Sequence, residues 1–247
     1  MKDSVTRNYP YSESFHLLRH QETSYAAERI ISILLRHIPD ISSAVDVGCG
    51  VGTFLSTLNE HGIESILGLD GDWVDNSMLV ISRNNFRTTD LTRPPDLGRT
   101  YDLAICLEVA EHLAPENEQS FMGWLCRLSD CILFSAAVPM QGGVHHVNEA
   151  WQSYWAHLFA VHGFRYIDLI RPLIWEDQAI PFWYRQNTLV YVKEGGLRAV
   201  DQSSLPLPLP LDLIHPELYL MRADGSRQKG ILQRLIRRLD SCARRLK

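Results

Sequence analysis

Apolar residues recur along the chain at two spacings, one typical of helices and one typical of buried strands. The first helical pattern begins after Thr23 or Ser24, either of which would cap a helix, and reaches about Ile38. Pro39 then stands where a helix should stop. Residues 1–22 are polar, and we expect them to form an irregular arm.

Strand and helix patterns alternate after this point. Strands are expected at Ser43–Val47, Glu64–Leu69, Phe86–Leu91, Tyr101–Leu107, Cys131–Val138, Phe164–Ile170 and Asn187–Lys193. Helices are expected at Gly52–His61, from about Asp72, at Glu116–Leu128 and at Glu149–His162. The alternation predicts an α/β fold with a doubly wound, mostly parallel seven-stranded sheet. The last two strands could pair as a terminal antiparallel hairpin.

The character of the chain changes after Gly195-Gly196. Alternating prolines in Ser203–Leu211 favour an extended strap. Residues 226–247 form the pattern of a basic amphipathic helix. The predicted organisation is therefore an arm and helix at 1–40, a main domain at 41–195, a strap at 196–225 and a basic helix at 226–247.

Composition narrows the class of protein. The 247 residues are 45% hydrophobic, which is enough for a sizeable core, and the net charge of −5 does not favour a broad nucleic-acid surface. Residues 1–20 hold no apolar signal-peptide core, and no apolar run reaches the length of a membrane span. The cysteines show no metal spacing, so we expect a cytoplasmic chain with reduced thiols at Cys49, Cys106, Cys126, Cys131 and Cys242.

The candidate chemistry begins with glycines that follow the first strand. Gly48, Gly50 and Gly52 allow a ligand to approach the backbone closely at the start of a helix. Asp70 stands about 20 residues later, where an acid can accept hydrogen bonds from ribose hydroxyls. The spacing is G-x-G-x-G and not the G-x-G-x-x-G of NAD sites, which makes an NAD dehydrogenase a distant alternative.

The carboxylate of Asp46 separates the two kinds of cofactor. It would repel the pyrophosphate of NAD, whereas it would attract the ammonium and sulfonium groups of S-adenosylmethionine (SAM). The charge therefore favours SAM. The alternative is a strand–helix turn that holds no ligand, and Cys49 is expected to be a small packing residue in this turn.

Four motifs in order resemble those of class I SAM-dependent methyltransferases over residues 43–193. They are Asp46 to Gly52, Leu67 to Asp70, Asp90-Leu91 and Tyr101 to Leu113. The resemblance implies that Asp70, followed by Gly71, holds the ribose. It also implies that Asp90 and the backbone of Leu91 meet the adenine, and that Leu107, Glu108 and Val109 lie beside the methionine part of SAM. The product would be S-adenosylhomocysteine, and Asp90 as a strand-end cap is the alternative.

Histidines at the carboxyl ends of strands four and five are the candidates for removal of an acceptor proton. They are His112, His145 and His146, and Trp151, Tyr154 and Trp155 could wall an acceptor pocket. A metal site made by His145, His146 and Glu149 is not favoured, because adjacent histidines rarely point the same way. We therefore expect no metal.

Residues 141–155 and 214–220 resemble a bacterial subgroup linked with surface polysaccharide or secondary-metabolite assembly. This resemblance implies O-methylation of a sugar or small metabolite. Methylation at nitrogen or carbon, or SAM binding without turnover, are the alternatives. The basic C-terminal helix could dock on the domain, contact anionic lipid at the inner membrane face, or bind RNA.

Overall fold

The computed structural model describes residues 13–195 and 205–224, and their side chains from residue 23 onward. The chain divides into two compact units, Met1–Leu213 and Ile214–Lys247, which are described separately. The expected basic helix at 226–247 and residues 1–12 of the expected arm lie outside the described residues.

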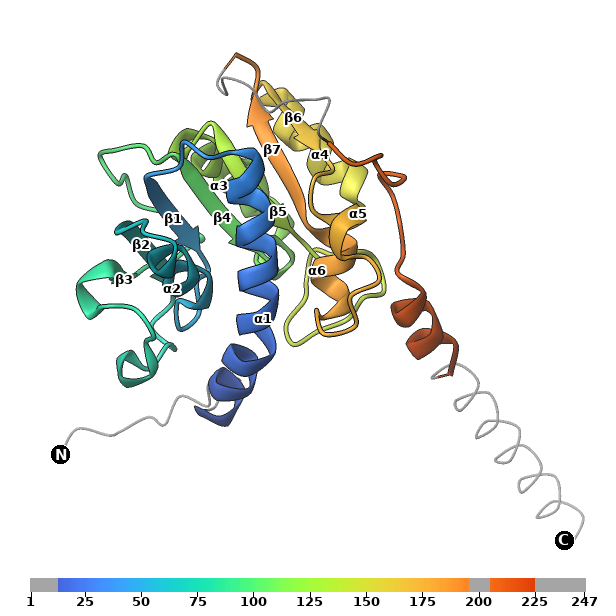
Figure 1. The fold of residues 1–247 in the computed structure, drawn as a ribbon, viewed down its shortest axis with the longest axis horizontal. Helices are drawn as coiled ribbons and strands as arrows, with labels where there is room; N and C mark the ends of the chain where they lie inside the picture. Colours follow the sequence, from blue (N-terminus) through green and yellow to red (C-terminus); the bar gives the residue numbers. More distant parts are fainter. Residues whose placement is uncertain (1–12, 196–204, 225–247) are drawn as a thin grey trace, which may run out of the picture. The chain divides into compact units, whose positions relative to one another are not determined.

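The first unit is built on a seven-stranded sheet in the order β3-β2-β1-β4-β5-β7-β6 (Figure 1). Strands β1 to β5 are parallel, and β7 pairs antiparallel with both β5 and β6. The predicted fold class is therefore confirmed, including its terminal antiparallel strands. The strands are β1 Ser43–Val47, β2 Ser65–Asp70, β3 Phe86–Thr88, β4 Leu103–Leu107, β5 Cys131–Ser135, β6 Phe164–Ile167 and β7 Leu189–Lys193.

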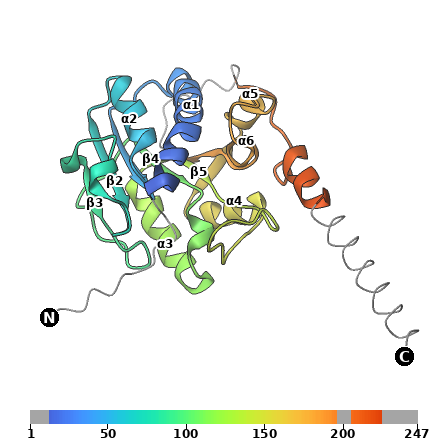
Figure 2. The same cartoon turned by 90° about the horizontal axis from the view of Figure 1, so that it is seen from below.

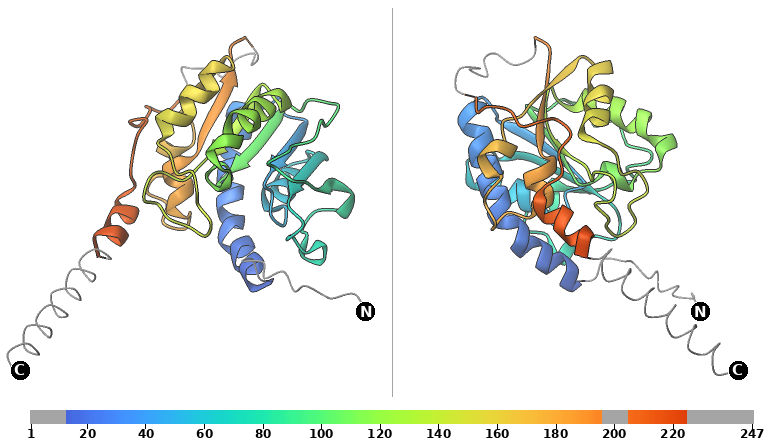
Figure 3. Two further views of the ribbon diagram at one scale, coloured as in Figure 1. Left: turned by 180° about the vertical axis from the view of Figure 1, so that it is seen from behind. Right: turned by 90° about the vertical axis from the view of Figure 1, so that its right-hand side faces the viewer.

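Helices cover both faces of the sheet. Figure 2, in which the domain is seen from below, shows helices on either side of the strands. One face carries α1 Glu13–His37, α2 Thr53–Glu60, α5 Arg171–Ile174 and α6 Phe182–Asn187. The other face carries α3 Pro115–Leu128 and α4 Gln152–Val161, which Figure 3 shows from behind. Each face of the sheet packs into its own apolar cluster, so the central strands β1, β4, β5 and β7 are buried on both sides, whereas the edge strands β3 and β6 are partly exposed.

The first helix is longer than the sequence pattern predicted. It begins at Glu13, ten residues or more before the expected caps Thr23 and Ser24, so the irregular arm was wrong for residues 13–22. The added stretch has neither glycine nor proline and is rich in residues that tolerate the helical backbone. The helix therefore continues through the expected start.

The helix expected from about Asp72 was also wrong. This segment holds only two short 3₁₀ turns, η1 Asn76–Met78 and η2 Arg83–Asn85. The side chain of Asp75 accepts a hydrogen bond from the backbone N–H of Ser77, and Ser82 caps the second turn in the same way. Such local side-chain bonds compete with the helical backbone and favour turns.

The strap is fastened to the sheet domain by a buried ion pair. Arg171 and Asp168 have fully buried side chains joined by two hydrogen bonds of 2.9 and 2.8 Å. The guanidinium also donates to the carbonyl oxygens of Pro210 and Leu211, while Asp168 accepts from the backbone N–H of Leu209. Residues 205–213 are therefore held in an extended path without a helix or strand of their own.

The described part of the second unit contains a helix at residues 216–224, which sequence analysis had not separated from the strap. His215 precedes this helix, and its Nδ1 accepts a hydrogen bond from the backbone N–H of Glu217. Among the described residues of the whole chain, every helix is too short or too polar to span a membrane.

Candidate active site

The glycine turn after β1 adopts the backbone that its sequence predicted. Gly48, Gly50 and Gly52 all have left-handed φ angles, of 80, 55 and 92°, which favour glycine over other residues. A Cβ atom on Gly48 would collide with the side chain of Val109, which follows β4. The turn and the end of β4 therefore lie in direct contact. Cys49 is part of this turn, and its buried side chain packs against Gly68 of β2. Burial raises the pKa of its thiol, as suits a packing residue.

Asp46 of β1 and Asp70 of β2 are buried carboxyl groups next to the glycine turn. Asp46 pairs with Gly68 of β2 and Ile105 of β4, near the carboxyl ends of the three central strands. Burial, followed by the negative charge of Asp70, raises the pKa of Asp46 well above its usual range. A cation bound beside Asp46 would relieve this cost, which is the electrostatic environment that the ammonium group of SAM requires.

Asp70 holds the glycine turn as well as the edge of β2. Its Oδ2 accepts a hydrogen bond of 2.7 Å from the N–H of Gly50, and its Oδ1 accepts one of 2.6 Å from the N–H of Gly71. Burial raises the pKa of Asp70, while the two backbone bonds act in the opposite direction. Each carboxylate oxygen has further lone pairs for ribose hydroxyls.

Replacing Asp70 with alanine should weaken SAM binding tenfold or more, because it would remove the ribose acceptor that the sequence predicts together with the support of the Gly50 N–H. Tenfold corresponds to about 1.4 kcal/mol. Titration calorimetry with SAM would measure the change, with Asp40→Ala, at an exposed turn, as the control. Equal affinity in the two variants would show that Asp70 does not hold the ribose.

Asp90 and Leu91 lie beyond the end of β3, which stops at Thr88 and not at Leu91 as predicted. The exposed Asp90 carboxylate accepts hydrogen bonds from the backbone and side chain of Thr92 and pairs with Arg93. These bonds lower the pKa of Asp90. Asp90 thus caps a turn in this structure, and Leu91 packs partly buried against the core.

Leu107, Glu108 and Val109 follow one another at the end of β4. Glu108 has a left-handed φ of 55°, which is uncommon for a residue other than glycine, and its N–H donates to the carbonyl oxygen of Ser135. Its carboxylate accepts hydrogen bonds from Gln141 and Asn187. Burial raises the pKa of Glu108, against the effect of these bonds. The backbone turn directs this carboxylate into a network of amides.

Glu111 lies in the following 3₁₀ turn, η3 Ala110–His112, and its side chain is 0% exposed. Both of its carboxylate oxygens are buried without a hydrogen-bond partner among the described residues. Burial and the neighbouring Glu108 raise the pKa of Glu111 well above its usual range. Such a group is costly unless it meets a ligand, since buried polar atoms are normally paired.

The backbone of Glu111 brings the segment after β5 to the end of β4. Its carbonyl oxygen accepts hydrogen bonds from the N–H groups of Val147 and Asn148, at 2.8 and 3.0 Å. Glu149 closes the same segment by accepting from the N–H groups of Met140 and Gly142. We call residues 139–149 the acceptor loop. Its two sets of bonds fix the position of His146.

The structure brings His112 and His146 together. Their ring centroids are 4.8 Å apart, and the rings are nearly perpendicular. Nδ1 of His146 lies 3.0 Å from Oε1 of Glu149, which leaves Nε2 on the other side of the ring. Burial, with a contribution from His146, lowers the pKa of His112 to about 4. The side chain of His145 is exposed, and this residue has a left-handed φ of 61°.

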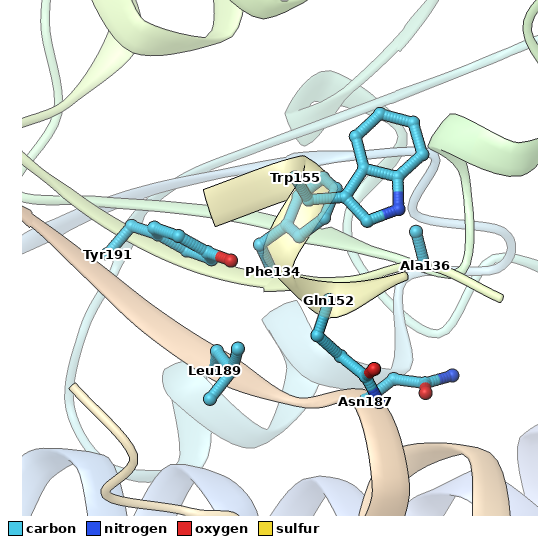
Figure 4. Close-up of a pocket in the computed structure, with 7 residues that line it drawn as sticks. All are labelled: Phe134, Ala136, Gln152, Trp155, Asn187, Leu189 and Tyr191. Atoms are coloured by element: carbon cyan, nitrogen blue, oxygen red, sulfur yellow. The ribbon is translucent and has the colours of Figure 1, made fainter. Parts of the chain in front are cut away.

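The aromatic residues after the acceptor loop differ in exposure. Trp151 and Tyr154 are 40% and 42% exposed, and the Tyr154 hydroxyl donates to Glu118. Trp155 is buried in the core, so it is not available to wall an open pocket. It borders a small hollow with Gln152 and Asn187 (Figure 4), which side chains fill, and we assign no ligand to it.

Sequence reasoning missed three residues of this edge. Glu111 was quoted within the fourth-strand motif without a role, and its burial could not be inferred from spacing. Gln141 and Asn187 stand 46 residues apart and meet only because β7 runs antiparallel beside β5. The sequence feature that could have indicated this contact is the position of these two amides next to two apolar strands, β5 and β7.

Comparisons with known proteins identify the family of this chain. The sequence family described as methyltransferase domain matches residues 18–168, which is more than half of the chain. The ubiquinone biosynthesis O-methyltransferase of Rickettsia bellii (strain OSU 85-389) is 32% identical over 114 residues, or 43% of this chain. The chain spans less than half of that relative's length, since the match covers 45% of it.

Solved structures share the fold. The sugar N-methyltransferase KedS8 from a Streptoalloteichus species superposes with a TM-score of 0.58 at 15% identity, over 78% of this chain and 97% of that one. The magnesium protoporphyrin IX methyltransferase ChlM from Synechocystis, with bound S-adenosylhomocysteine, gives 0.53 at 18% identity, over 78% and 100%.

These findings confirm the resemblance to class I SAM-dependent methyltransferases and SAM as the cofactor. The chain belongs to the methyltransferase domain family.

Proposed function

We propose that this methyltransferase transfers a methyl group from SAM to a hydroxyl group of a sugar, glycan or small metabolite. The observation that carries this proposal is the His112–His146 pair, with His146 held by Glu149, at the carboxyl edge of β4 and β5. The relative from Rickettsia is an O-methyltransferase by name, which supports the same reaction class.

The cofactor side is assigned to the loops after β1, β2, β3 and β4. The turn at Gly48 to Gly52, with Cys49 beneath it, approaches the ligand through its backbone, and Asp46 attracts the ammonium group. Asp70 and Gly71 hold the ribose. Leu107, Glu108 and Val109 border the methionine part. Asp90 and Leu91 are assigned to the adenine, which requires that Asp90 release its turn bonds to Thr92.

The transfer is a displacement at carbon. The acceptor oxygen forms a bond to the methyl carbon while the carbon–sulfur bond breaks and its electron pair passes to sulfur, which gives S-adenosylhomocysteine. A hydroxyl must lose its proton in this step, and a positioned group that supports this loss contributes about 10²- to 10⁴-fold. We assign this support to His146 and His112.

Methyl-labelled SAM tests the reaction directly. The protein is incubated with separate fractions of a source-cell extract: small molecules, glycolipid and polysaccharide, protein, and RNA. Label entering the small-molecule or glycan fraction supports the proposal. Label confined to protein or RNA, or SAM binding in calorimetry with no label in any fraction, would contradict it.

Methylation of a sugar nitrogen is the second candidate. It is favoured by the fold shared with a sugar N-methyltransferase. An amine acceptor does not need a strong base, so variants of His146 would keep most of their turnover. With ¹³C-methyl SAM the product distinguishes the two, because a methyl group on oxygen and a methyl group on nitrogen have different chemical shifts in NMR spectra.

The basic segment 226–247 provides a prediction about lipid. An amphipathic helix with arginines off its apolar face should bind anionic membrane surfaces. We expect the full chain to sediment with anionic vesicles, and a chain lacking residues 226–247 to remain in solution. Neutral vesicles are the control, and equal sedimentation of the two chains would contradict this role.

A further inference from the structure

We infer that Glu111, His112 and His146 bind a divalent transition-metal ion. One donor atom from each residue lies within 4.8 Å of the others. Donors on a tetrahedral ion, each at about 2.1 Å, lie about 3.4 Å apart. Movements of up to about 0.8 Å in each side chain therefore bring all three donors onto one ion.

The buried carboxylate of Glu111 is an independent observation that points to a ligand. Neither of its oxygens makes a hydrogen bond of ordinary geometry with a described residue, although the N–H groups of Glu111 and Ala137 and the Glu108 carboxyl lie near enough to affect its pKa. The side chain is fully buried, and the two imidazoles lie beside it. The carboxylate of the nearby Glu108 is occupied by Gln141 and Asn187, so it is not counted as a donor. A cation at the cluster would satisfy Glu111 where the protein does not.

The residues around the three donors are also arranged as in a metal site. A histidine that binds a metal through one nitrogen usually gives its other N–H to a carboxylate, which fixes the ring. Glu149 does this for Nδ1 of His146 at 3.0 Å and is itself held by two backbone N–H groups. A Cβ on Gly143 would collide with the His146 ring, so this glycine leaves room for the imidazole.

The donor set selects the class of ion. Two imidazoles with one carboxylate suit Zn²⁺, Mn²⁺, Fe²⁺ or Co²⁺, whereas Mg²⁺ and Ca²⁺ prefer oxygen ligands throughout. Three protein donors leave coordination positions open for an acceptor oxygen. This set differs from the His145, His146 and Glu149 set that the sequence disfavoured, because Glu111 and His112 replace His145 and Glu149.

The use of the ion, though not its binding, rests on the proposed function. The acceptor hydroxyl binds the ion, which makes its proton easier to lose, and the proton passes to water. The oxygen then bonds to the methyl carbon as the carbon–sulfur pair passes to sulfur. His146 acts in this step as a ligand, in place of the free base that the sequence suggested.

The test measures ion binding without any acceptor. Protein freed of metal by chelator is titrated with Zn²⁺, Mn²⁺ and Mg²⁺ by calorimetry, and with Co²⁺ by visible absorption. We expect one Zn²⁺ per chain, Co²⁺ absorption bands, and Mg²⁺ bound at least tenfold more weakly. Glu111→Gln, which keeps the shape of the side chain, should weaken Zn²⁺ binding at least tenfold.

Glu118→Gln is the matched control, because Glu118 is also buried but lies outside the cluster. It should bind Zn²⁺ like the wild type, and SAM affinity should be unchanged in both variants, which shows that they fold. His112→Asn is a second variant with the same expected loss as Glu111→Gln. Absence of Zn²⁺, Mn²⁺ and Co²⁺ binding in the wild type, or wild-type affinity in Glu111→Gln and His112→Asn, would overturn the inference.

Failure of the ion site and failure of the proposed function are distinguishable. Methyl transfer to a hydroxyl at an unchanged rate by the metal-free protein would overturn the ion's role and leave the reaction standing. Stoichiometric Zn²⁺ binding that Glu111→Gln weakens, without a methyl acceptor in any extract fraction, would uphold the ion site and count against the reaction.

Discussion

Replacing His146 with alanine should lower the rate of methyl transfer about 100-fold or more while the affinity for SAM stays the same. The expected factor is the usual contribution of a group that supports proton removal, about 10²- to 10⁴-fold. His146 lies in the acceptor loop after β5, and its ring is 12% exposed. Turnover is measured with labelled SAM, and affinity by calorimetry.

His145 offers a matched control for this variant. It is the adjacent histidine of the same loop, but its side chain is exposed and does not join Glu111, His112 and His146. His145→Asn suits the left-handed backbone at this position and should keep most of the turnover. If His146→Ala and His145→Asn have the same rate as the wild type, proton removal does not depend on the acceptor loop.

Replacing Arg171 with methionine should destabilise the protein by about 3–5 kcal/mol. The substitution leaves the carboxylate of Asp168 fully buried without its partner, which is a costly way to break a buried ion pair. It also removes the donors that hold the carbonyl oxygens of Pro210 and Leu211. Since 1 kcal/mol is about 2–4 °C for a chain of this size, Tm should fall by about 10 °C.

Thermal unfolding followed by circular dichroism would measure this effect. Lys193→Met is the control, because Lys193 pairs with Asp130 at 3.3 Å on the surface, where both side chains are about half exposed. Surface pairs contribute about 1 kcal/mol or less. A Tm for Arg171→Met equal to that of Lys193→Met would show that the buried pair does not hold the strap.

The sheet and the glycine turn were predictable because each follows from local pattern. Apolar runs of strand length placed all seven strands, and Gly48, Gly50 and Gly52 have the left-handed φ angles that their positions suggested. The segment after Asp72 was not predictable by helical spacing, because hydrogen bonds from Asp75 and Ser82 decide its turns. The spacing of apolar residues indicates which positions are buried. It does not indicate where side-chain hydrogen bonds to the backbone compete with a helix.

The candidate catalytic edge was predictable only in part. Histidines near the ends of strands four and five were correctly placed at one edge, but which of them meet depends on backbone bonds that join distant segments. The carbonyl oxygen of Glu111 accepts hydrogen bonds from the N–H groups of Val147 and Asn148. These bonds place His146, and not His145, beside His112. No pattern within either segment indicates it.

The attachment of the acceptor loop has a consequence for how substrate range can change. Its bonds to Glu111 use the backbone of Val147 and Asn148, and the side chains that hold it come from Gln141, His146, Asn148 and Glu149. The exposed side chains of Met140, Val144 and Val147 are therefore open to substitution without loss of the loop's path. Directed evolution for new acceptors should succeed first at these three positions, with the cofactor turn untouched.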